Sequence, residues 1–88
     1  MEDLKQYREE ITKIDKEMAE LFESRMRISA KIAEYKKEHG LPIRDPKREE
    51  AMLSAYREYI KDPDMEEYYI RFLKNVVDIS ASCQERLF

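Results

Sequence analysis

The chain has 88 residues, a length that accommodates one domain rather than two independent cores. One glycine and three prolines, beside many Lys, Glu, Leu, Met and Ala residues, are typical of a helical protein. A net charge of −3 combines 17 basic with 20 acidic residues, and neither sign forms the long run of a nucleic-acid-binding stripe. No segment holds the roughly 20 apolar residues of a membrane-spanning helix, so we expect neither a nucleic acid nor a membrane as partner.

The remaining composition excludes several kinds of site. Cys83 is the single cysteine, so no disulfide can form within the chain, as is usual in a reducing compartment. The acidic N-terminus lacks the apolar run of a signal peptide. No metal-ligand spacing of His, Cys, Asp and Glu occurs, and no glycine-rich phosphate loop. We therefore expect a cytoplasmic protein that uses neither a metal nor another cofactor.

The first predicted helix runs from about Asp3 to about Glu38 and ends near Gly40. Its apolar residues alternate spacings of three and four over about five heptads, which predicts a continuous seam. At 1.5 Å per residue the helix is roughly 54 Å long, so a monomer of this size cannot bury the seam. The seam consists of Leu4, Tyr7, Ile11, Ile14, Met18, Leu21, Ile28, Ile32 and Tyr35.

Two shorter helices follow, and the fold class is all-α with a single domain over residues 1–88. The second helix runs over about 46–60, with Asp45 as N-cap and Pro46 in its first turn. The third runs over about 65–86, where Asp64 as N-cap and Glu67 form a capping-box pattern. Its predicted buried face consists of Tyr69, Phe72, Leu73, Val76 and Val77.

Arg25 stands in the first helix where the seam requires an apolar residue. A buried guanidinium needs a partner, so Arg25 either binds an anion, sets the register or extends to solvent. Lys36 follows three turns later on nearly the same face, roughly 16 Å along the axis. Together the two cations could hold a small dianion, whereas Lys36 alone could simply stabilise the helix C-terminus.

Arg8 lies about 25 Å along the axis from Arg25 and is turned by about 100°. Within one chain the two arginines cannot meet. In an antiparallel pair of long helices they can, because each N-terminal end passes the middle of the partner. The alternative is an ordinary surface arginine.

Polar residues also interrupt the apolar faces of the other two helices. Glu49 shares a face with Met52 and Leu53, so it either accepts from a ligand hydroxyl or forms a salt bridge or a favourable helix-dipole contact. Ser80 and Gln84 continue the apolar stripe of the third helix at a spacing of four. Buried neutral groups need hydrogen-bond partners, from a ligand, from each other or from the backbone.

Taken together, these interruptions resemble the pattern of the all-helical (AroQ-type) chorismate mutases. The segments YREEITKID, ESRMRISAKIAEYK, PIRDPKREE and ISASCQ carry the resemblance, which spans Tyr7 to Gln84. The matching positions, in the order of the chain, are Arg8, Arg25, Lys36, Asp45, Arg48, Glu49, Ser80 and Gln84.

The resemblance implies an intertwined helical homodimer, in which two chains exchange long helices and form two shared active sites. It implies that Arg25 of one chain and Arg8 of the other bind the two carboxylates of chorismate. Lys36 and Gln84 would hydrogen-bond the ether oxygen of the substrate. These four residues are the expected catalytic groups.

The remaining matched positions would complete the substrate-binding site. Glu49 would accept from the ring hydroxyl, assisted by the backbone near Asp45, and Arg48 and Ser80 would line the site around a carboxylate. The implied reaction is the Claisen rearrangement of chorismate to prephenate, which belongs to phenylalanine and tyrosine biosynthesis. That reaction needs no nucleophile, metal or proton transfer.

Two other functions stay open on the sequence. An isochorismate pyruvate-lyase shares this fold and a similar cationic pocket, although the pair of Glu49 and Gln84 favours the mutase. A noncatalytic helical dimerisation module would use Arg25 only to set the register of two helices.

Overall fold

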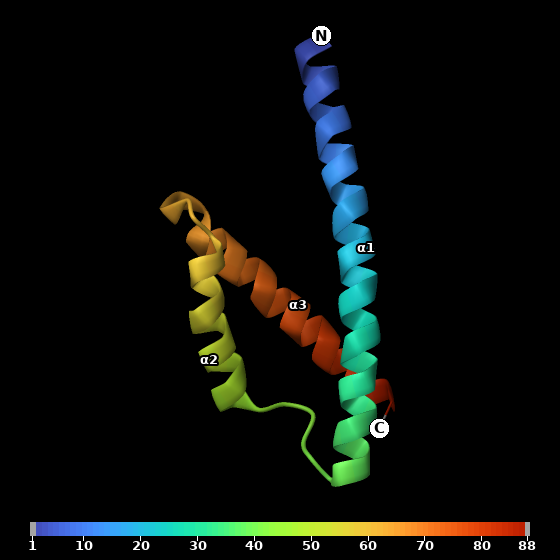
Figure 1. Cartoon of the computed structure of the whole chain (residues 1–88). Coiled ribbons are helices and arrows are strands. Elements are labelled where there is room, and N and C mark those ends of the chain that lie inside the picture. Colours follow the sequence, from blue (N-terminus) through green and yellow to red (C-terminus); the bar gives the residue numbers. More distant parts are fainter. Residues whose placement is uncertain (1, 88) are drawn as a thin grey trace.

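The computed structural model describes residues 2–87 as helices joined by short loops (Figure 1). The order is α1 (Glu2–His39), α2 (Pro46–Tyr56), the 3-10 turns η1 (Arg57–Tyr59) and η2 (Pro63–Met65), and α3 (Glu66–Leu87). The described part of the chain contains no strand, so the predicted all-α class with one long and two shorter helices is confirmed. None of the described helices is long and apolar enough to cross a bilayer.

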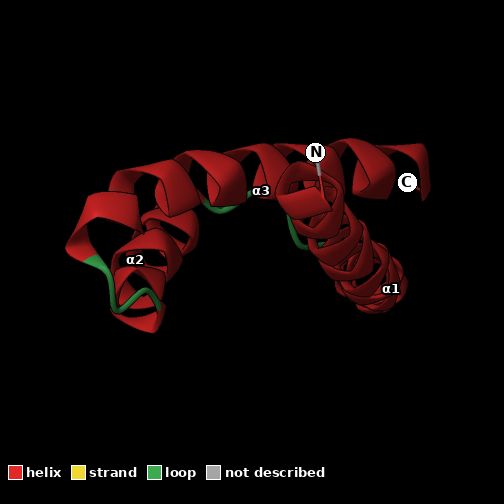
Figure 2. Cartoon of the chain, turned by 90° about the horizontal axis from the view of Figure 1, so that it is seen from above, coloured by secondary structure: helices red, strands yellow, loops and turns green. Residues whose placement is uncertain are grey.

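The helices form an open frame in which α3 bridges the other two (Figures 1 and 2). The C-terminal half of α3 crosses the lower part of α1, while α2 packs beside the N-terminal part of α3. The N-terminal half of α1 extends past this frame without a neighbour (Figure 1). The radius of gyration of 16.4 Å is accordingly larger than the value of about 12 Å for a compact chain of this length.

Helix α1 is continuous because residues 2–39 contain neither glycine nor proline. It ends at the predicted glycine. Gly40 has a φ of +64°, the amide of Leu41 donates to the carbonyl of Lys36 at 2.8 Å, and the amide of Gly40 donates to that of Lys37 at 3.5 Å. This pair of bonds is a Schellman motif, which turns the chain sharply into the loop that carries residues 41–45.

Helix α2 begins as predicted and ends earlier than predicted. The carboxylate of Asp45 accepts from the amide of Arg48 at 3.2 Å, which makes Asp45 the N-cap. The α-helix stops at Tyr56 and tightens into η1, where the rings of Tyr56 and Tyr59 stack with centroids 4.9 Å apart. Residues three apart eclipse in a 3-10 turn, so the stacked pair favours this tighter winding over a helix that continues to Ile60.

The predicted N-cap of the third helix at Asp64 is wrong. The carboxylate of Asp62 caps instead, accepting from the amide of Asp64 at 3.0 Å, because Pro63 takes the first helical position and moves the cap one residue earlier. Glu67 makes no capping box but pairs with Arg57 at 2.6 Å. Helix α3 proper begins at Glu66.

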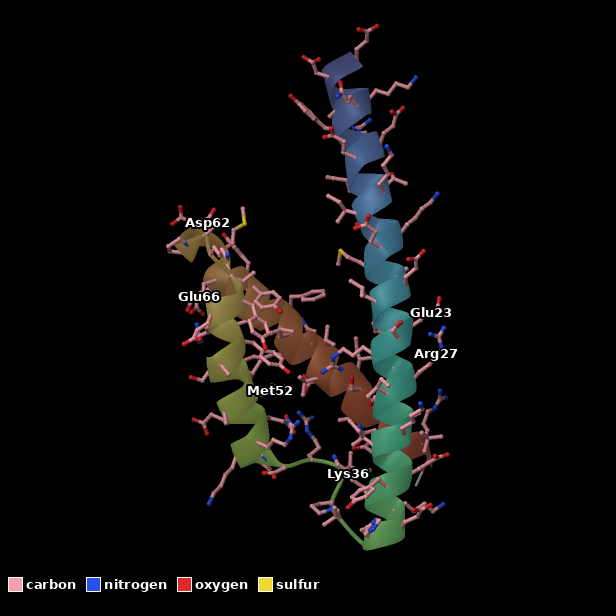
Figure 3. All side chains as sticks on the ribbon, viewed as in Figure 1. Glu23, Arg27, Lys36, Met52, Asp62 and Glu66 are labelled. Atoms are coloured by element: carbon pink, nitrogen blue, oxygen red, sulfur yellow. The ribbon has the colours of Figure 1, made fainter. Side chains whose placement is uncertain are left out.

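The core between α1 and α3 is small. Leu73 and Val76 are buried as predicted, whereas Phe72 is 47% exposed and Ile70 is buried in its place. Of α1, only Ser29 and Ala33 are buried. The apolar seam of α1 stays exposed along its whole length, while Glu23 and Arg27 form an ion pair on the side of α1 that faces away from α2 (Figure 3).

Candidate active site

Arg25 contacts α3 at the point where the apolar seam is interrupted. Its Nη1 donates to the hydroxyl of Ser80, which is 7% exposed and lies close to the sulfur of Met26. Arg25 is half-buried and forms no ion pair with any carboxylate in the described range. A half-buried guanidinium met only by a neutral hydroxyl keeps its full charge available for an anion.

Lys36 projects from the last turn of α1 toward the same part of α3. Its Nζ donates to the carbonyl of Ile43 in the loop and lies 3.4 Å from Oε1 of Gln84. Lys36 is half-buried and, among residues 2–87, has no carboxylate within ion-pair distance. The loop carbonyl and the amide oxygen therefore hold the ammonium in place without neutralising it.

Gln84 of α3 contacts α1 at Ser29 and Lys36. Its amide is 7% exposed, and its Nε2 donates to the hydroxyl of Ser29 at 2.8 Å. The sequence predicted that Ser80 and Gln84 would be buried and need partners, and this is confirmed. Their partners lie on α1, whereas bonding to each other or to the backbone was the alternative.

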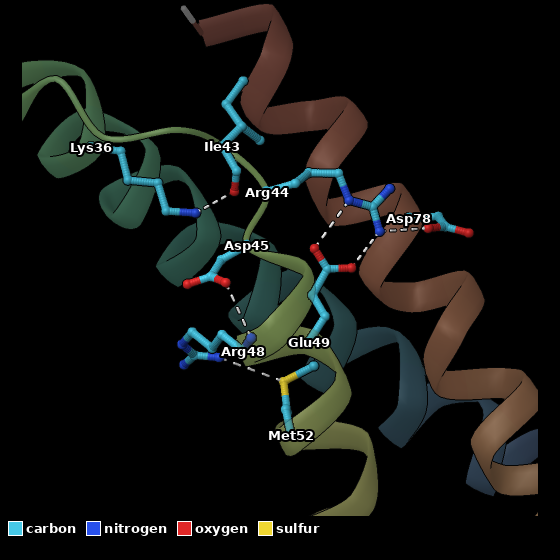
Figure 4. Close-up of polar contacts among 8 residues, drawn as sticks. All are labelled: Lys36, Ile43, Arg44, Asp45, Arg48, Glu49, Met52 and Asp78. Carbon is cyan, nitrogen blue, oxygen red and sulfur yellow. Dashed lines mark hydrogen bonds and ion pairs between the residues drawn. The ribbon is translucent and has the colours of Figure 1, made fainter.

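Glu49 projects from the first turn of α2 toward Arg44 of the loop (Figure 4). Arg44 of the loop binds both of its carboxylate oxygens, at 2.5 and 3.1 Å, and also reaches Asp78 of α3 at 3.0 Å. The hydrogen bonds from Arg44 hold the pKa of Glu49 below its ordinary value, although partial burial opposes the effect, and the charge of Lys36 adds to it. Glu49 is thus an ionised hydrogen-bond acceptor. It forms a salt bridge, which was one of the alternatives that its position in the sequence left open.

Asp45 and Arg48 lie at the start of α2 (Figure 4). The side chain of Asp45 is engaged in capping and its carbonyl accepts from the amide of Glu49 at 2.9 Å, so its backbone N–H is the group left to meet a ligand. The guanidinium of Arg48 is exposed and lies 3.9 Å from the sulfur of Met52. Among the described residues, no ion pair holds this long cationic side chain at the start of α2.

Arg8 is the one predicted residue that the chain does not bring to the others. It lies on the N-terminal half of α1, exposed, in a shallow depression lined only by residues of α1 itself, Leu4, Lys5, Glu9 and Thr12. The rise along the helix separates it from Arg25 by about 25 Å. Within one chain Arg8 is therefore far from the other seven predicted positions.

Two further polar residues, Ser29 and Arg44, contact this group and were not predicted from the sequence. Ser29 lies four residues after Arg25 and seven before Lys36, on the same helix face, so the spacing alone could have indicated it. Arg44 sits in a loop, where no periodicity exists to reveal which carboxylates it meets.

The contact between α1 and α3 holds a guanidinium, an ammonium and a primary amide, and α2 adds a carboxylate. These are hydrogen-bond donors of fixed position, the kind of group that binds carboxylates and stabilises negative charge on oxygen. Within residues 2–87 no group of three or more His, Cys, Asp or Glu residues is placed to hold a metal ion. The described donor set suits electrostatic stabilisation of a small anion.

Comparison with known proteins identifies relatives of the chain. T-protein of Haemophilus influenzae is 46% identical over 57 residues, 65% of this chain and 15% of that protein. The bifunctional chorismate mutase/prephenate dehydratase of Aquifex aeolicus is 29% identical over 99% of this chain, which spans 25% of that protein. The chorismate mutase of Methanocaldococcus jannaschii is 31% identical over 76% of this chain and 68% of its own length.

The chain thus spans a quarter or less of the length of the two longer relatives. No solved structure matches it significantly. The family model for chorismate mutase type II matches residues 7–85, nearly the whole chain, and includes all eight predicted positions. The chain therefore belongs to the chorismate mutase type II family.

Proposed function

We propose that this chain is an isomerase that converts chorismate to prephenate by a Claisen rearrangement. The observation that carries the proposal is that Arg25 meets Ser80 and Lys36 meets Gln84 across the same contact of α1 and α3, with neither cation in an ion pair among the described residues. In the reaction one ether C–O bond breaks and one C–C bond forms within a single molecule. The atoms balance without water, a cofactor or a covalent intermediate.

Lys36 and Gln84 are proposed to act on the ether oxygen. Negative charge grows on this oxygen because the C–O bond breaks before the new C–C bond is complete. Donors fixed at that point stabilise the transition state more than the substrate, and one well-placed donor contributes about 10²- to 10³-fold in rate. The carbonyl of Ile43 supports this role because it holds the ammonium of Lys36 in position before the substrate arrives.

Arg25 and Ser80 are proposed to bind one substrate carboxylate, with Arg48 at the rim. A guanidinium pairs with a carboxylate through two parallel hydrogen bonds, which fixes the orientation of the flexible enolpyruvyl group as well as its position. Glu49 is proposed to accept from the ring hydroxyl, assisted by the backbone at Asp45. Its lowered pKa supports this role, since the carboxylate stays ionised at neutral pH.

The second carboxylate is proposed to bind Arg8 of a partner chain in a homodimer with shared sites. The accessible surface of the chain is 7677 Å² at a mass of 10.7 kDa, about 2,200 Å² more than the roughly 5,500 Å² of a folded monomer of that mass. Stable homodimers bury an area of this order. The exposed seam of α1 supplies an apolar surface that a second copy of α1 can cover.

We place this activity in the biosynthesis of phenylalanine and tyrosine, in the cytoplasm. Cys83, the single cysteine of the chain, is free and exposed, which is compatible with a reducing compartment.

The direct test is to follow the ultraviolet absorbance of chorismate and of isochorismate in separate incubations with the protein. We expect chorismate to disappear with formation of prephenate, and isochorismate to persist. Release of pyruvate from isochorismate, with chorismate unchanged, would establish the lyase instead. A protein inert toward both substrates would favour the dimerisation module.

A further inference from the structure

A hydrogen bond links the two helices of the site at Ser29 and Gln84, and nothing in the proposed chemistry uses the serine. Ser29 is 5% exposed, Gln84 is 7% exposed, and the 2.8 Å bond from Nε2 to the hydroxyl is buried between α1 and α3. On α1, Ser29 lies between Arg25 and Lys36, on the face that both cations share.

The two contacts of Gln84 determine which way its amide points. Lys36 carries three donors and no acceptor, so it can only face the amide oxygen of Gln84. The amide nitrogen must then point toward Ser29, whose hydroxyl accepts one of its two N–H groups. The second N–H is left to donate to an oxygen acceptor that enters the site.

We propose that Ser29 is a positioning residue, which fixes the amide of Gln84 in the orientation that presents an N–H to the substrate ether oxygen. Without the hydroxyl, the nitrogen end of the amide loses its anchor, and the amide can turn so that its N–H no longer points at the ether oxygen. This inference rests on the proposed role of Gln84 as the donor to the ether oxygen, and the experiment below separates the two.

The test uses the pH profile of Gln84→Glu. The introduced carboxyl can donate to the ether oxygen only when it is protonated, so we expect activity to be confined to acidic pH. The hydroxyl of Ser29 can rotate and donate to the ionised carboxylate, which lowers the pKa of the introduced group. Removing this donor by Ser29→Ala raises that pKa, and the alkaline limb of the profile moves to higher pH by about one unit.

In the otherwise native protein we expect Ser29→Ala to lower kcat about 5- to 10-fold with little change in KM, because the loss of one buried hydrogen bond affects the transition state. Ser24→Ala is the matched control, since Ser24 is exposed on the same helix. Circular dichroism checks that the variants are folded. If Ser29→Ala fails to fold, Ser29→Thr and Ser29→Val, equal in shape but different in the hydroxyl, replace it.

The outcomes separate the two claims. If Gln84→Glu stays fully active at neutral pH, the proposed role of Gln84 is wrong. If Gln84→Glu is confined to acidic pH but Ser29→Ala leaves its profile in place, Gln84 keeps its role and the positioning by Ser29 is overturned. An unchanged kcat of Ser29→Ala in the native background, or equal activity of Ser29→Thr and Ser29→Val, overturns the positioning as well.

Discussion

The two halves of α1 carry the same apolar spacing and meet different surroundings. In the C-terminal half, Ser29 and Ala33 are buried against α3, and Arg25 and Lys36 find partners there. In the N-terminal half no described side chain is buried. The difference teaches that the two halves of α1 are suited to different contacts, since one half packs against α3 of its own chain and the other leaves its apolar seam exposed.

The contrast extends to the chemistry of the two surfaces. The face of α1 that meets α3 is, apart from Met26, polar or small, whereas the seam beside it is apolar and exposed, with Leu21 at 70% and Ile14 at 54%. A helix that packs its polar line internally and leaves its apolar line outside is arranged for a partner on the apolar side. Three predictions sharpen this contrast, in order of expected effect.

The largest effect is expected from a charge in the exposed seam. Ile14→Glu places one carboxylate per chain in the proposed interface, at a cost of several kcal/mol for each unpaired buried charge. We expect the dimer to dissociate and activity to be lost. Sedimentation and the chorismate assay measure both, and Lys16→Glu is the control because Lys16 is exposed, points about 200° away from Ile14 on the same helix and lies two turns from Arg8. An intact, active Ile14→Glu dimer would place the interface elsewhere.

The next effect concerns the cation at the other end of α1. Lys36→Ala removes one donor to the ether oxygen, so we expect kcat to fall about 10²- to 10³-fold while the dimer stays intact. Steady-state kinetics compares it with Lys37→Ala, the neighbouring exposed cation, which we expect to retain nearly full activity. Equal losses in both variants would mean that only the overall charge of this half matters.

A smaller effect is expected at the ion-pair cluster of Arg44. Because this cluster depresses the pKa of Glu49, the folded state binds that proton less readily than the unfolded state. The ionised Glu49 therefore stabilises the folded state at pH values above the ordinary pKa of about 4.3. This stabilisation is lost as the pH falls through the lower pKa of the folded state. We expect Arg44→Gln to raise the pKa of Glu49 toward its ordinary value and to flatten the loss of stability in acid.

Carboxyl carbon NMR measures this pKa, and urea unfolding as a function of pH measures the stability. Arg57→Gln is the matched control, since Arg57 also pairs with two carboxylates, Glu66 and Glu67, at the far end of α2. A shift of the Glu49 pKa in both variants, or in neither, would contradict the assignment. Both variants should remain dimeric, because these contacts lie within one chain.

The sequence predicted best where one local signal decides the structure. The absence of glycine and proline determines the length of α1, and Asp45 before Pro46 determines the start of α2. The buried polar positions Ser80 and Gln84 also follow from the stripe of α3. These features depend on residues close in the sequence.

The wrong or missing predictions concern features that depend on competition between neighbouring residues or on tertiary contacts. Asp64 has the capping pattern, but Pro63 moves the cap to Asp62. Ser29 shares the helix face of Arg25 and Lys36, but its partner Gln84 lies 55 positions away in the sequence. Arg44 lies in a loop without periodicity, from which it contacts both Glu49 and Asp78. The partner of Arg8 is not on this chain at all under the proposed dimer, so no single-chain pattern can supply it.

The central claim is that each site combines Arg25 of one chain with Arg8 of another, and subunit mixing tests it most directly. Arg8→Ala and Arg25→Ala, each nearly inactive alone, are unfolded together, refolded and assayed. About half of the dimers are then mixed and hold one intact site of two, so we expect about one quarter of wild-type activity. As a control, wild type is refolded with the variant that carries both substitutions on one chain. We expect this mixture to be less active than the same two proteins kept unmixed, because its mixed dimers hold no intact site. No recovery in the first mixture, from variants shown to form mixed dimers, would contradict the shared site.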